Sequence, residues 1–287
     1  MAKRKGNPKR KMNTGRMIVL MSLGLVAMMI VILGFLFIVQ SIVSPSAPQE
    51  TPIAETPTPD PVYPNDYDWQ YLKKENDRFV YEDSKYTSRT GIDVSYSQGD
   101  IDWDRVRADG IDFAIIRAGY RGYETGELHE DAYFRYNIEN AVRVGMDVGV
   151  YFFSQAISAE EAKEEAEFVL DLIKGYPVLS VAFDLEEADK EGRIADNSRE
   201  LNTAGAISFS KTIKAAGYTP LVYGSASWMT YDIRMWELQD MVEFWMAAYG
   251  WEYPKFPYVF SIWQYSSTGH VDGISTIVDM NLQIMEK

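Results

Sequence analysis

The chain has 287 residues, of which 46% are hydrophobic and 14% aromatic, so it can bury the core of one large domain with appendages. It has no cysteine and only two histidines, which excludes a disulfide scaffold, a thiol nucleophile and a three-histidine zinc site. The formal net charge of −14 combines a basic start with a strongly acidic remainder, and this argues against nucleic-acid binding.

The first predicted element is a membrane-spanning helix over residues 17–43. Residues 17–39 carry no charge, and a helix of this length crosses a hydrocarbon core of ~30 Å. Residues 1–16 form a tail with seven Lys or Arg side chains and no acid, which the positive-inside rule places in the cytoplasm. A cleaved signal peptide is the alternative, although its apolar region usually spans only ~7–15 residues. We therefore expect a single-pass protein of the cell membrane with its bulk outside.

A linker and a transitional segment follow the predicted span. Residues 44–64 are rich in Pro, Thr and acids and have too few large apolar side chains to form a core, so we expect an extended extracellular linker. Residues 65–90 contain scattered aromatic and aliphatic side chains and are interpreted as a segment that packs on the domain of residues 91–287.

From residue 91 onward, short β-rich runs alternate with helical patterns. The predicted strands are residues 92–95, 113–118, 147–153, 178–184, 219–223, 244–247, 260–264 and 277–281. The predicted helices are residues 102–108, 131–144, 158–174 and 202–216, and later gaps are too short or irregular for full helices. This order predicts an α/β fold, a TIM-like barrel with degenerate late helices. An open doubly wound sheet is the alternative, but no glycine-rich phosphate loop follows the first strand.

Four carboxylates lie in or just after these apolar strands, where burial of a charge needs a reason. Asp93 lies in the first strand, Asp184 and Glu186 end the fourth, and Asp279 lies in the last. Asp184 and Glu186 point to the same side of an extended strand, with Cα atoms ~6.5 Å apart. Repulsion at this spacing raises at least one pKa, so the pair can supply both the proton donor and the anion that glycoside hydrolysis needs. Any one acid could instead be a structural acceptor, so the hypothesis rests on all four sharing one rim.

Aromatic side chains flank the same strand ends, which fits a polysaccharide groove, although ordinary core packing is the alternative for any single ring. The candidate substrate-binding residues are Tyr151, Tyr223, Trp245, Tyr249, Trp263 and Gln264.

The motifs GIDVSYSQGDIDWDRV, YFFSQA, FDLE, WMAAY and WQYSSTGHVDGISTIVDMN, in this order and spacing, resemble those of glycoside hydrolase family 25 lysozymes over about residues 91–285. The resemblance implies a (β/α)5(β)3 barrel and an N-acetylmuramidase that cleaves the β-1,4 bond between N-acetylmuramic acid and N-acetylglucosamine with retention. It also implies that Glu186 is the general acid/base and Asp184 the nucleophile or the stabiliser of the substrate's acetamido group. Asp93 and Asp279 would shape the cleft floor, while Tyr151, Trp245, Tyr249 and Trp263 would contact sugar.

Many family members carry His where this chain has Phe152, which removes one polar contact but leaves the four acids in place. We expect a monomer that acts on the peptidoglycan glycan strand without a metal or another cofactor.

Two other function classes compete with this interpretation. The first is a non-catalytic cell-wall-binding module on the same barrel, but such a module would tend to lose its proton donor, and Glu186 is present. The second is an amidase, metallopeptidase or serine hydrolase, but neither an H-E-x-x-H nor a G-x-S-x-G motif occurs.

Overall fold

The computed structural model describes residues 29, 33, 60–186 and 192–287. The chain divides into two compact units, Met1–Thr58 and Pro59–Lys287, and the second contains the fold considered below. The predicted tail, the predicted membrane span over residues 17–43 and most of the predicted linker lie outside the described residues, apart from the two isolated positions. Among the residues that are described, no helix has the length and apolar character needed to cross a membrane.

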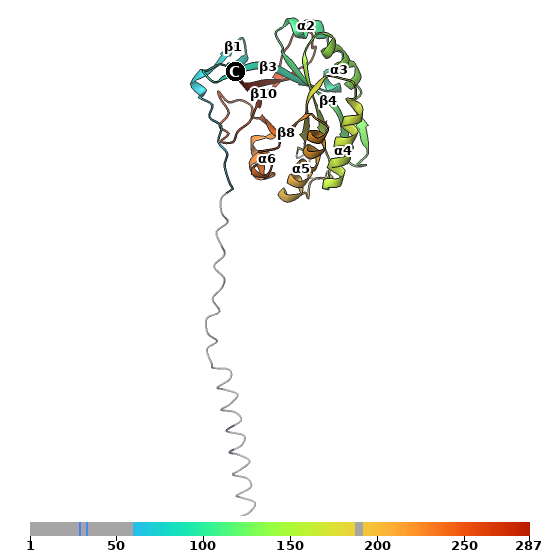
Figure 1. Ribbon diagram of the computed structural model, residues 1–287, viewed down its shortest axis with the longest axis vertical. Helices are drawn as coiled ribbons and strands as arrows, with labels where there is room; N and C mark the ends of the chain where they lie inside the picture. Colours follow the sequence, from blue (N-terminus) through green and yellow to red (C-terminus); the bar gives the residue numbers. More distant parts are fainter. Residues whose placement is uncertain (1–28, 30–32, 34–59, 187–191) are drawn as a thin grey trace, which may run out of the picture. The chain divides into compact units, whose positions relative to one another are not determined.

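Eight strands close into a barrel (Figure 1). In chain order they are β3 (Tyr86–Val94), β4 (Phe113–Arg121), β6 (Asp147–Phe153), β7 (Val178–Asp184), β8 (Thr219–Ser225), β9 (Glu243–Ala247), β10 (Ile262–Gly269) and β11 (Val278–Glu286). Neighbouring strands are parallel from β3 round to β10, and β11 closes the barrel by running antiparallel to both β10 and β3. A short strand, β5 (Leu128–Glu130), pairs with β4 outside the closed ring. All eight predicted strands and the barrel closure are therefore confirmed.

Helices follow the first five barrel strands. They are α2 (Trp103–Ala108), α3 (Phe134–Arg143), α4 (Ala159–Leu172), α5 (Arg199–Ala215) and the short α6 (Ala226–Tyr231). Serine side chains accept hydrogen bonds from backbone N–H groups at the starts of α4, α5 and α6, which fixes where these helices begin. Between α6 and β9 the described chain forms only a 3-10 turn, Met235–Glu237. The four predicted helices are confirmed to within a few residues, and the late part of the barrel lacks long helices as predicted.

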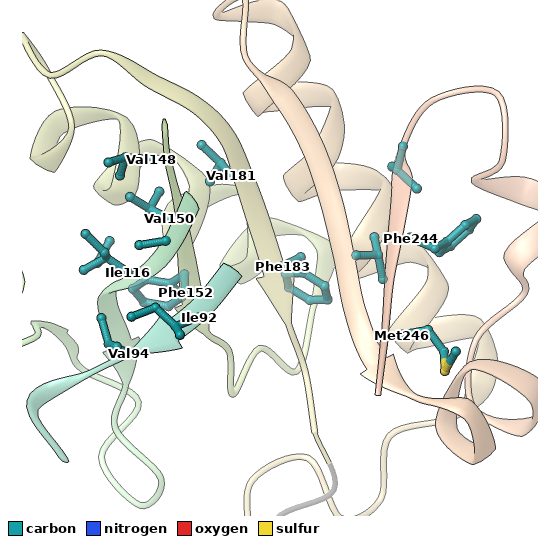
Figure 2. Close-up of a cluster of buried hydrophobic side chains, with 14 of the residues drawn as sticks. Ile92, Val94, Ile116, Val148, Val150, Phe152, Val181, Phe183, Phe244 and Met246 are labelled. Carbon is teal, nitrogen blue, oxygen red and sulfur yellow. The ribbon is translucent and has the colours of Figure 1, made fainter. Parts of the chain in front are cut away.

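The alternation of side chains along each strand divides the apolar residues into two cores. The larger core lies between the barrel wall and the helices and includes Ile92, Val150, Phe152, Phe183 and Phe244 (Figure 2). The smaller core fills the barrel interior and consists of Phe113, Ile115, Ala182, Leu221, Tyr223, Trp245, Ala247 and Ile262. Phe152 is fully buried against Phe168, at 6.0 Å between ring centroids, so this position belongs to the outer core.

An N-terminal hairpin precedes the barrel. A 3-10 turn, Trp69–Tyr71, leads into β1 (Leu72–Glu75), which pairs antiparallel with β2 (Arg78–Tyr81) through a turn in which Asn76 and Asp77 both have positive φ. Tyr81 is fully buried. Upstream of the hairpin, the Asn65 amide donates to two backbone carbonyls near the start of β10, at 3.0 and 2.9 Å. Residues 65–85 are thus fastened to the barrel at several points.

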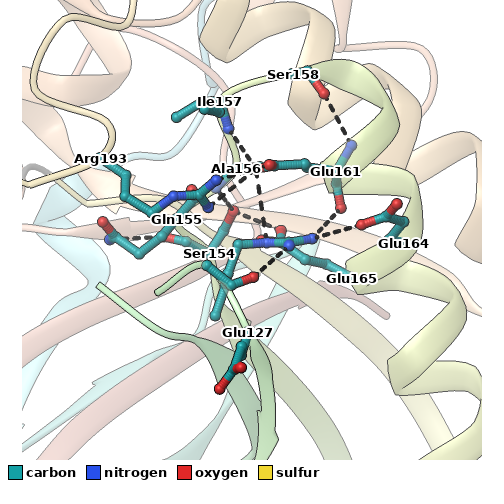
Figure 3. A network of polar contacts seen from close by, with 12 residues as sticks. Glu127, Ser154, Gln155, Ala156, Ile157, Ser158, Glu161, Glu164, Glu165 and Arg193 are labelled. Carbon is teal, nitrogen blue, oxygen red and sulfur yellow. Dashed lines mark hydrogen bonds and ion pairs between the residues drawn. The ribbon is translucent and has the colours of Figure 1, made fainter. Parts of the chain in front are cut away.

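A buried polar network links α4 to the loop that follows β7 (Figure 3). The Arg121 Nε donates to Glu165 Oε1 at 2.7 Å, and the Ser154 hydroxyl donates to Glu165 Oε2 at 2.6 Å. Arg193, in the loop beyond β7, donates to Glu161 Oε1 at 2.8 Å. Burial raises the pKa of Glu165 to about 7, although its bonds to Ser154 and Arg121 oppose that change.

Candidate active site

The four predicted acids meet at the carboxyl end of the barrel. Asp93 on β3 stands opposite Asp279 on β11 in the antiparallel register. Asp184 is the last residue of β7, and Glu186 follows two positions later. The charges of Asp93, Glu186 and Asp279 each raise the pKa of at least one other acid of the four, and the pKa of Asp184 is raised by both Glu186 and Asp93, which only close neighbours do strongly. The structure therefore brings together the side chains that the sequence placed on one rim.

Asp93 is fixed by a platform of amide and hydroxyl groups inside the barrel. Gln264 Nε2 and Asn281 Nδ2 both donate to its Oδ2, at 2.8 and 2.7 Å. The amide oxygen of Gln264 accepts in turn from the hydroxyls of Tyr223, at 2.8 Å, and Tyr249. Burial and the charge of Asp279 raise the pKa of Asp93 well above its usual value, while the two amide donors oppose that rise. The platform therefore fixes the orientation of a carboxyl group that is costly to ionise.

Asn281, which sequence reasoning missed, carries one of these two amides. Its oxygen accepts a hydrogen bond from Trp245 Nε1 at 2.8 Å, which leaves the amide nitrogen facing Asp93. A signal was available, because Asn281 lies two residues after Asp279 on the same strand and so shares its face.

Asp184 and Glu186 differ in exposure. Asp184 is buried, and its Oδ1 has no hydrogen-bond partner among the described residues, whereas the Glu186 side chain is exposed to solvent. Burial, followed by repulsion from Glu186, raises the pKa of Asp184. Surrounding protein atoms also raise the pKa of Glu186, whereas the interaction with the Asp184 side chain opposes that rise. Because each carboxylate changes the pKa of the other, the two titrate as a pair, and one partner is accessible to a ligand.

A cation reaches the cluster from β4. Arg117 stands beside Tyr151 in the strand register, and its positive charge lowers the pKa of Asp184 against the larger effect of burial. Its Nε donates to the buried Asp131 carboxylate at 2.7 Å, and its guanidinium lies 4.9 Å from the ring centroid of Tyr96. Sequence reasoning also missed Arg117, although an arginine within the apolar run FAIIRAG was a usable signal.

The predicted aromatic residues take different positions. Tyr249 is 46% exposed at the rim, and Tyr151 is half-buried at the mouth, so both can touch a ligand. Tyr223 and Trp245 lie deeper, with ring centroids 4.5 Å apart, and form the floor beneath the acids. The expected direct sugar contact at Trp245 is not supported, because the ring is buried and its Nε1 is bonded to Asn281.

Trp263 is not part of the site. It is fully buried in the outer core, where its ring centroid lies 4.8 Å from that of Phe79 and its Nε1 donates to Ala248 O at 2.9 Å. The expectation that Trp263 contacts sugar is therefore wrong. Side chains alternate along β10, so Gln264 points into the barrel and its neighbour Trp263 must point out.

Residues 92–274 match the sequence profile of the glycosyl hydrolases family 25. The chain belongs to this family. Lysozyme M1 of Streptomyces globisporus is 30% identical over 200 residues, which cover 67% of this chain and 66% of that protein. The autolytic lysozyme of Clostridium acetobutylicum is 25% identical over 194 residues, which cover 67% of this chain and 54% of that protein. The chain thus spans about two thirds or less of these two relatives.

Solved structures agree with the family 25 assignment. The bacterial lysozyme from Streptomyces coelicolor superposes with a TM-score of 0.59 at 28% identity, covering 67% of this chain and 90% of that one. The modular autolysin LytC from Streptococcus pneumoniae, solved with a synthetic peptidoglycan ligand, shares the fold with a TM-score of 0.61 at 24% identity, covering 74% of this chain and 51% of that one.

The family 25 match contains three of the four acids. Asp93, Asp184 and Glu186 lie within residues 92–274, whereas Asp279 lies beyond the end of the match. The barrel closure supplies Asp279, because β11 pairs directly with β3. Among the described residues, no group of three or more metal-ligating side chains is arranged to hold a metal ion.

Proposed function

We propose that this family 25 chain is a peptidoglycan hydrolase that cleaves the β-1,4 bond between N-acetylmuramic acid and N-acetylglucosamine. The observation that carries the proposal is the Asp184–Glu186 pair, in which a buried and an exposed carboxylate at the barrel mouth shift each other's pKa. The names of the relatives, lysozyme and autolytic lysozyme, support the same substrate class.

In the proposed reaction, Glu186 is the general acid because it is the accessible member of the pair. It donates a proton to the glycosidic oxygen as the bond to the anomeric carbon breaks, and it later accepts a proton from the attacking water. For this step Glu186 must be protonated and Asp184 must carry the negative charge. The positive charge of Arg117 favours that charge distribution.

The spacing of the pair supports retention of configuration. Inverting glycosidases separate their carboxylates widely enough to hold a water molecule between substrate and base, whereas retaining enzymes bring them closer. Asp184 and Glu186 are two positions apart in the chain and shift each other's pKa, so they are close neighbours, as the carboxylates of retaining enzymes are. Asp184 therefore has one of two roles. It attacks the anomeric carbon to form an ester that water hydrolyses, or it stabilises the substrate's 2-acetamido group while the oxygen of that group attacks the same carbon.

Replacing the proton donor tests the assignment. Glu186→Gln should abolish the release of fragments from purified cell walls while leaving wall binding and thermal unfolding close to wild type. Glu167→Gln, which changes an exposed glutamate on α4, is the matched control and should lyse walls normally. Mass spectrometry should find N-acetylmuramic acid at the reducing end of the products. The proposal would be refuted if Glu186→Gln lysed walls normally or if the products carried N-acetylglucosamine at the reducing end. If the wild-type protein bound walls without releasing any fragments, a non-catalytic binding module would be favoured.

We further propose that residues 17–43 anchor the protein in the cell membrane, with residues 1–16 in the cytoplasm and the barrel outside. The uncharged run of residues 17–39 and the seven preceding basic side chains support this orientation. The barrel should remain in the membrane fraction after an alkaline wash and should be removed by protease added outside intact cells. Release of the barrel into the medium would contradict the anchor.

A further inference from the structure

A groove of about 1510 Å³ runs along the outer wall of the barrel. The β1–β2 hairpin forms one side, and residues 249–252 and 266–272 line the other. One end of the groove reaches the acid cluster through Tyr249, which lines the groove and whose hydroxyl donates to Gln264 beneath Asp93. The groove therefore begins one side chain away from the active site.

The hairpin wall is held firmly in place. The Phe79 ring on β2 packs against Trp263 and Tyr265, with centroid distances of 4.8 and 5.1 Å. The neighbouring Arg78 forms an ion pair with Asp109 beyond α2. The hairpin precedes the family 25 match, which begins at residue 92, so this wall is an addition to the matched barrel. A ligand could bind here without first ordering the wall, which lowers the entropic cost of binding.

The lining offers both aromatic and hydroxyl groups to a ligand, and its acidic side chains, which include Glu75 and Glu252, disfavour an anionic one. Trp251 is 49% exposed and Tyr249 is 46% exposed, and the lining also includes the hydroxyls of Ser266, Ser267 and Thr268. Both cations of the groove are already paired, Lys74 with Asp77 at 3.0 Å and Arg78 with Asp109. A peptide rich in carboxylates would find no free Lys or Arg among these lining residues. A sugar chain satisfies the groove better, because its apolar faces stack on aromatic rings and its hydroxyls bond to polar rims.

We propose that this groove binds the peptidoglycan glycan strand beyond the sugars at the cleavage site. The proposal rests on the proposed function for the identity of the glycan, but it concerns binding and not bond cleavage. It predicts that the protein prefers long strands over short ones and that the preference depends on the groove side chains.

Two groove variants and one control test the proposal in the full-length chain. Trp251→Ala removes the exposed ring, and Ser267→Trp fills the groove with a bulky side chain. Tyr231→Ala is the control, because it removes a ring that is 72% exposed on α6 and does not line the groove. Binding is measured by calorimetry in a Glu186→Gln background, which prevents turnover. The ligands are glycan strands freed of stem peptides and the tetrasaccharide of the same repeat, both with the lactyl carboxylates of N-acetylmuramic acid converted to amides so that they carry no charge.

Trp251→Ala should weaken binding of the long strands about three- to tenfold, the range for loss of one stacked ring, and Ser267→Trp should weaken it at least as much because the new side chain occupies the space of the ligand. Binding of the tetrasaccharide should be unchanged, and the control should match the parent protein with both ligands. Equal affinity of parent and groove variants for long strands would overturn the proposal. So would an equal loss with the tetrasaccharide, or Trp251-dependent binding of isolated stem peptides. Because turnover is not needed, a wild-type protein without lytic activity would refute the proposed function and still leave this binding test decisive.

Discussion

Asp279→Asn should stabilise the folded protein at neutral pH. The Asp279 carboxylate is half-buried on β11, and burial followed by repulsion from Glu186 raises its pKa from 3.8 to about 6. A group with a raised pKa in the folded state favours folding while it is protonated and loses that contribution as pH rises through the folded pKa. At pH 7 the ionised Asp279 therefore opposes folding, and an uncharged isostere removes the penalty.

The rise in the pKa of Asp279 sets an upper limit to the free energy of unfolding that Asp279→Asn can add. A pKa raised from 3.8 to about 6 corresponds to about 3 kcal/mol. Part of this free energy is charge repulsion from Glu186, which Glu186 can relieve by binding a proton. The measured increase in the free energy of unfolding should therefore be smaller. In a domain of this size, 3 kcal/mol would raise Tm by about 6–12 °C at most.

Urea unfolding at a series of pH values measures this effect. The free energy of unfolding of Asp279→Asn should equal that of wild type below pH 4. Its excess over wild type should grow between pH 4 and 6 and stay constant above pH 6. Asp196→Asn, at an exposed aspartate in the loop before α5, controls for removing one charge from an acidic domain. A variant that is less stable than wild type at pH 7, or whose gain does not change with pH, would refute the reasoning.

Three further substitutions test the packing and polar contacts around the site. Arg121→Met should cost about 3–5 kcal/mol in urea unfolding, because Glu165 stays buried without its cation, and adding Glu165→Leu should restore part of the loss. Trp263→Ala should cost about 3–5 kcal/mol, whereas Trp251→Ala, at an exposed ring, should change stability by less than about 0.5 kcal/mol in the same assay. Gln264→Leu should destabilise by about 1–3 kcal/mol and reduce wall lysis, because Asp93 loses a donor and two tyrosine hydroxyls lose their acceptor. If Arg121→Met, Trp263→Ala or Gln264→Leu left the unfolding midpoint unchanged, the stabilising role given to the contacts of that side chain would be wrong.

The barrel and its acid rim could be predicted because both depend on local signals. Most of the strands contain a short apolar run with β-branched residues, and a parallel barrel places the carboxyl ends of its strands at one edge. Asp93, Asp184 and Glu186 could therefore be assigned to one rim without knowing any register. Asp279 was harder, since β11 runs antiparallel and brings its first residues, not its last, to that rim.

The remaining errors come from information that only the register and long-range packing supply. Trp263 and Gln264 are adjacent in sequence but face opposite sides of the wall, and the apolar run does not reveal which one points inward. Asn281 and Arg117 are single polar residues in apolar strands, and their roles depend on partners far along the chain. The packing of residues 65–90 on the domain was predicted from their aromatic and aliphatic side chains, but the contact of Phe79 with Trp263 depends on residues far apart in the chain.

The antiparallel return of β11 also determines where the barrel can be extended by protein engineering. Glu286 pairs with Tyr86, the first residue of β3, and the backbone N–H of Lys287 donates to Lys85 O at 3.0 Å. Both residues lie at the end of the barrel opposite Asp93 and Asp279. A reporter domain or surface tether fused after Lys287 would therefore leave from the end opposite the acids and keep the catalytic mouth open to an insoluble substrate.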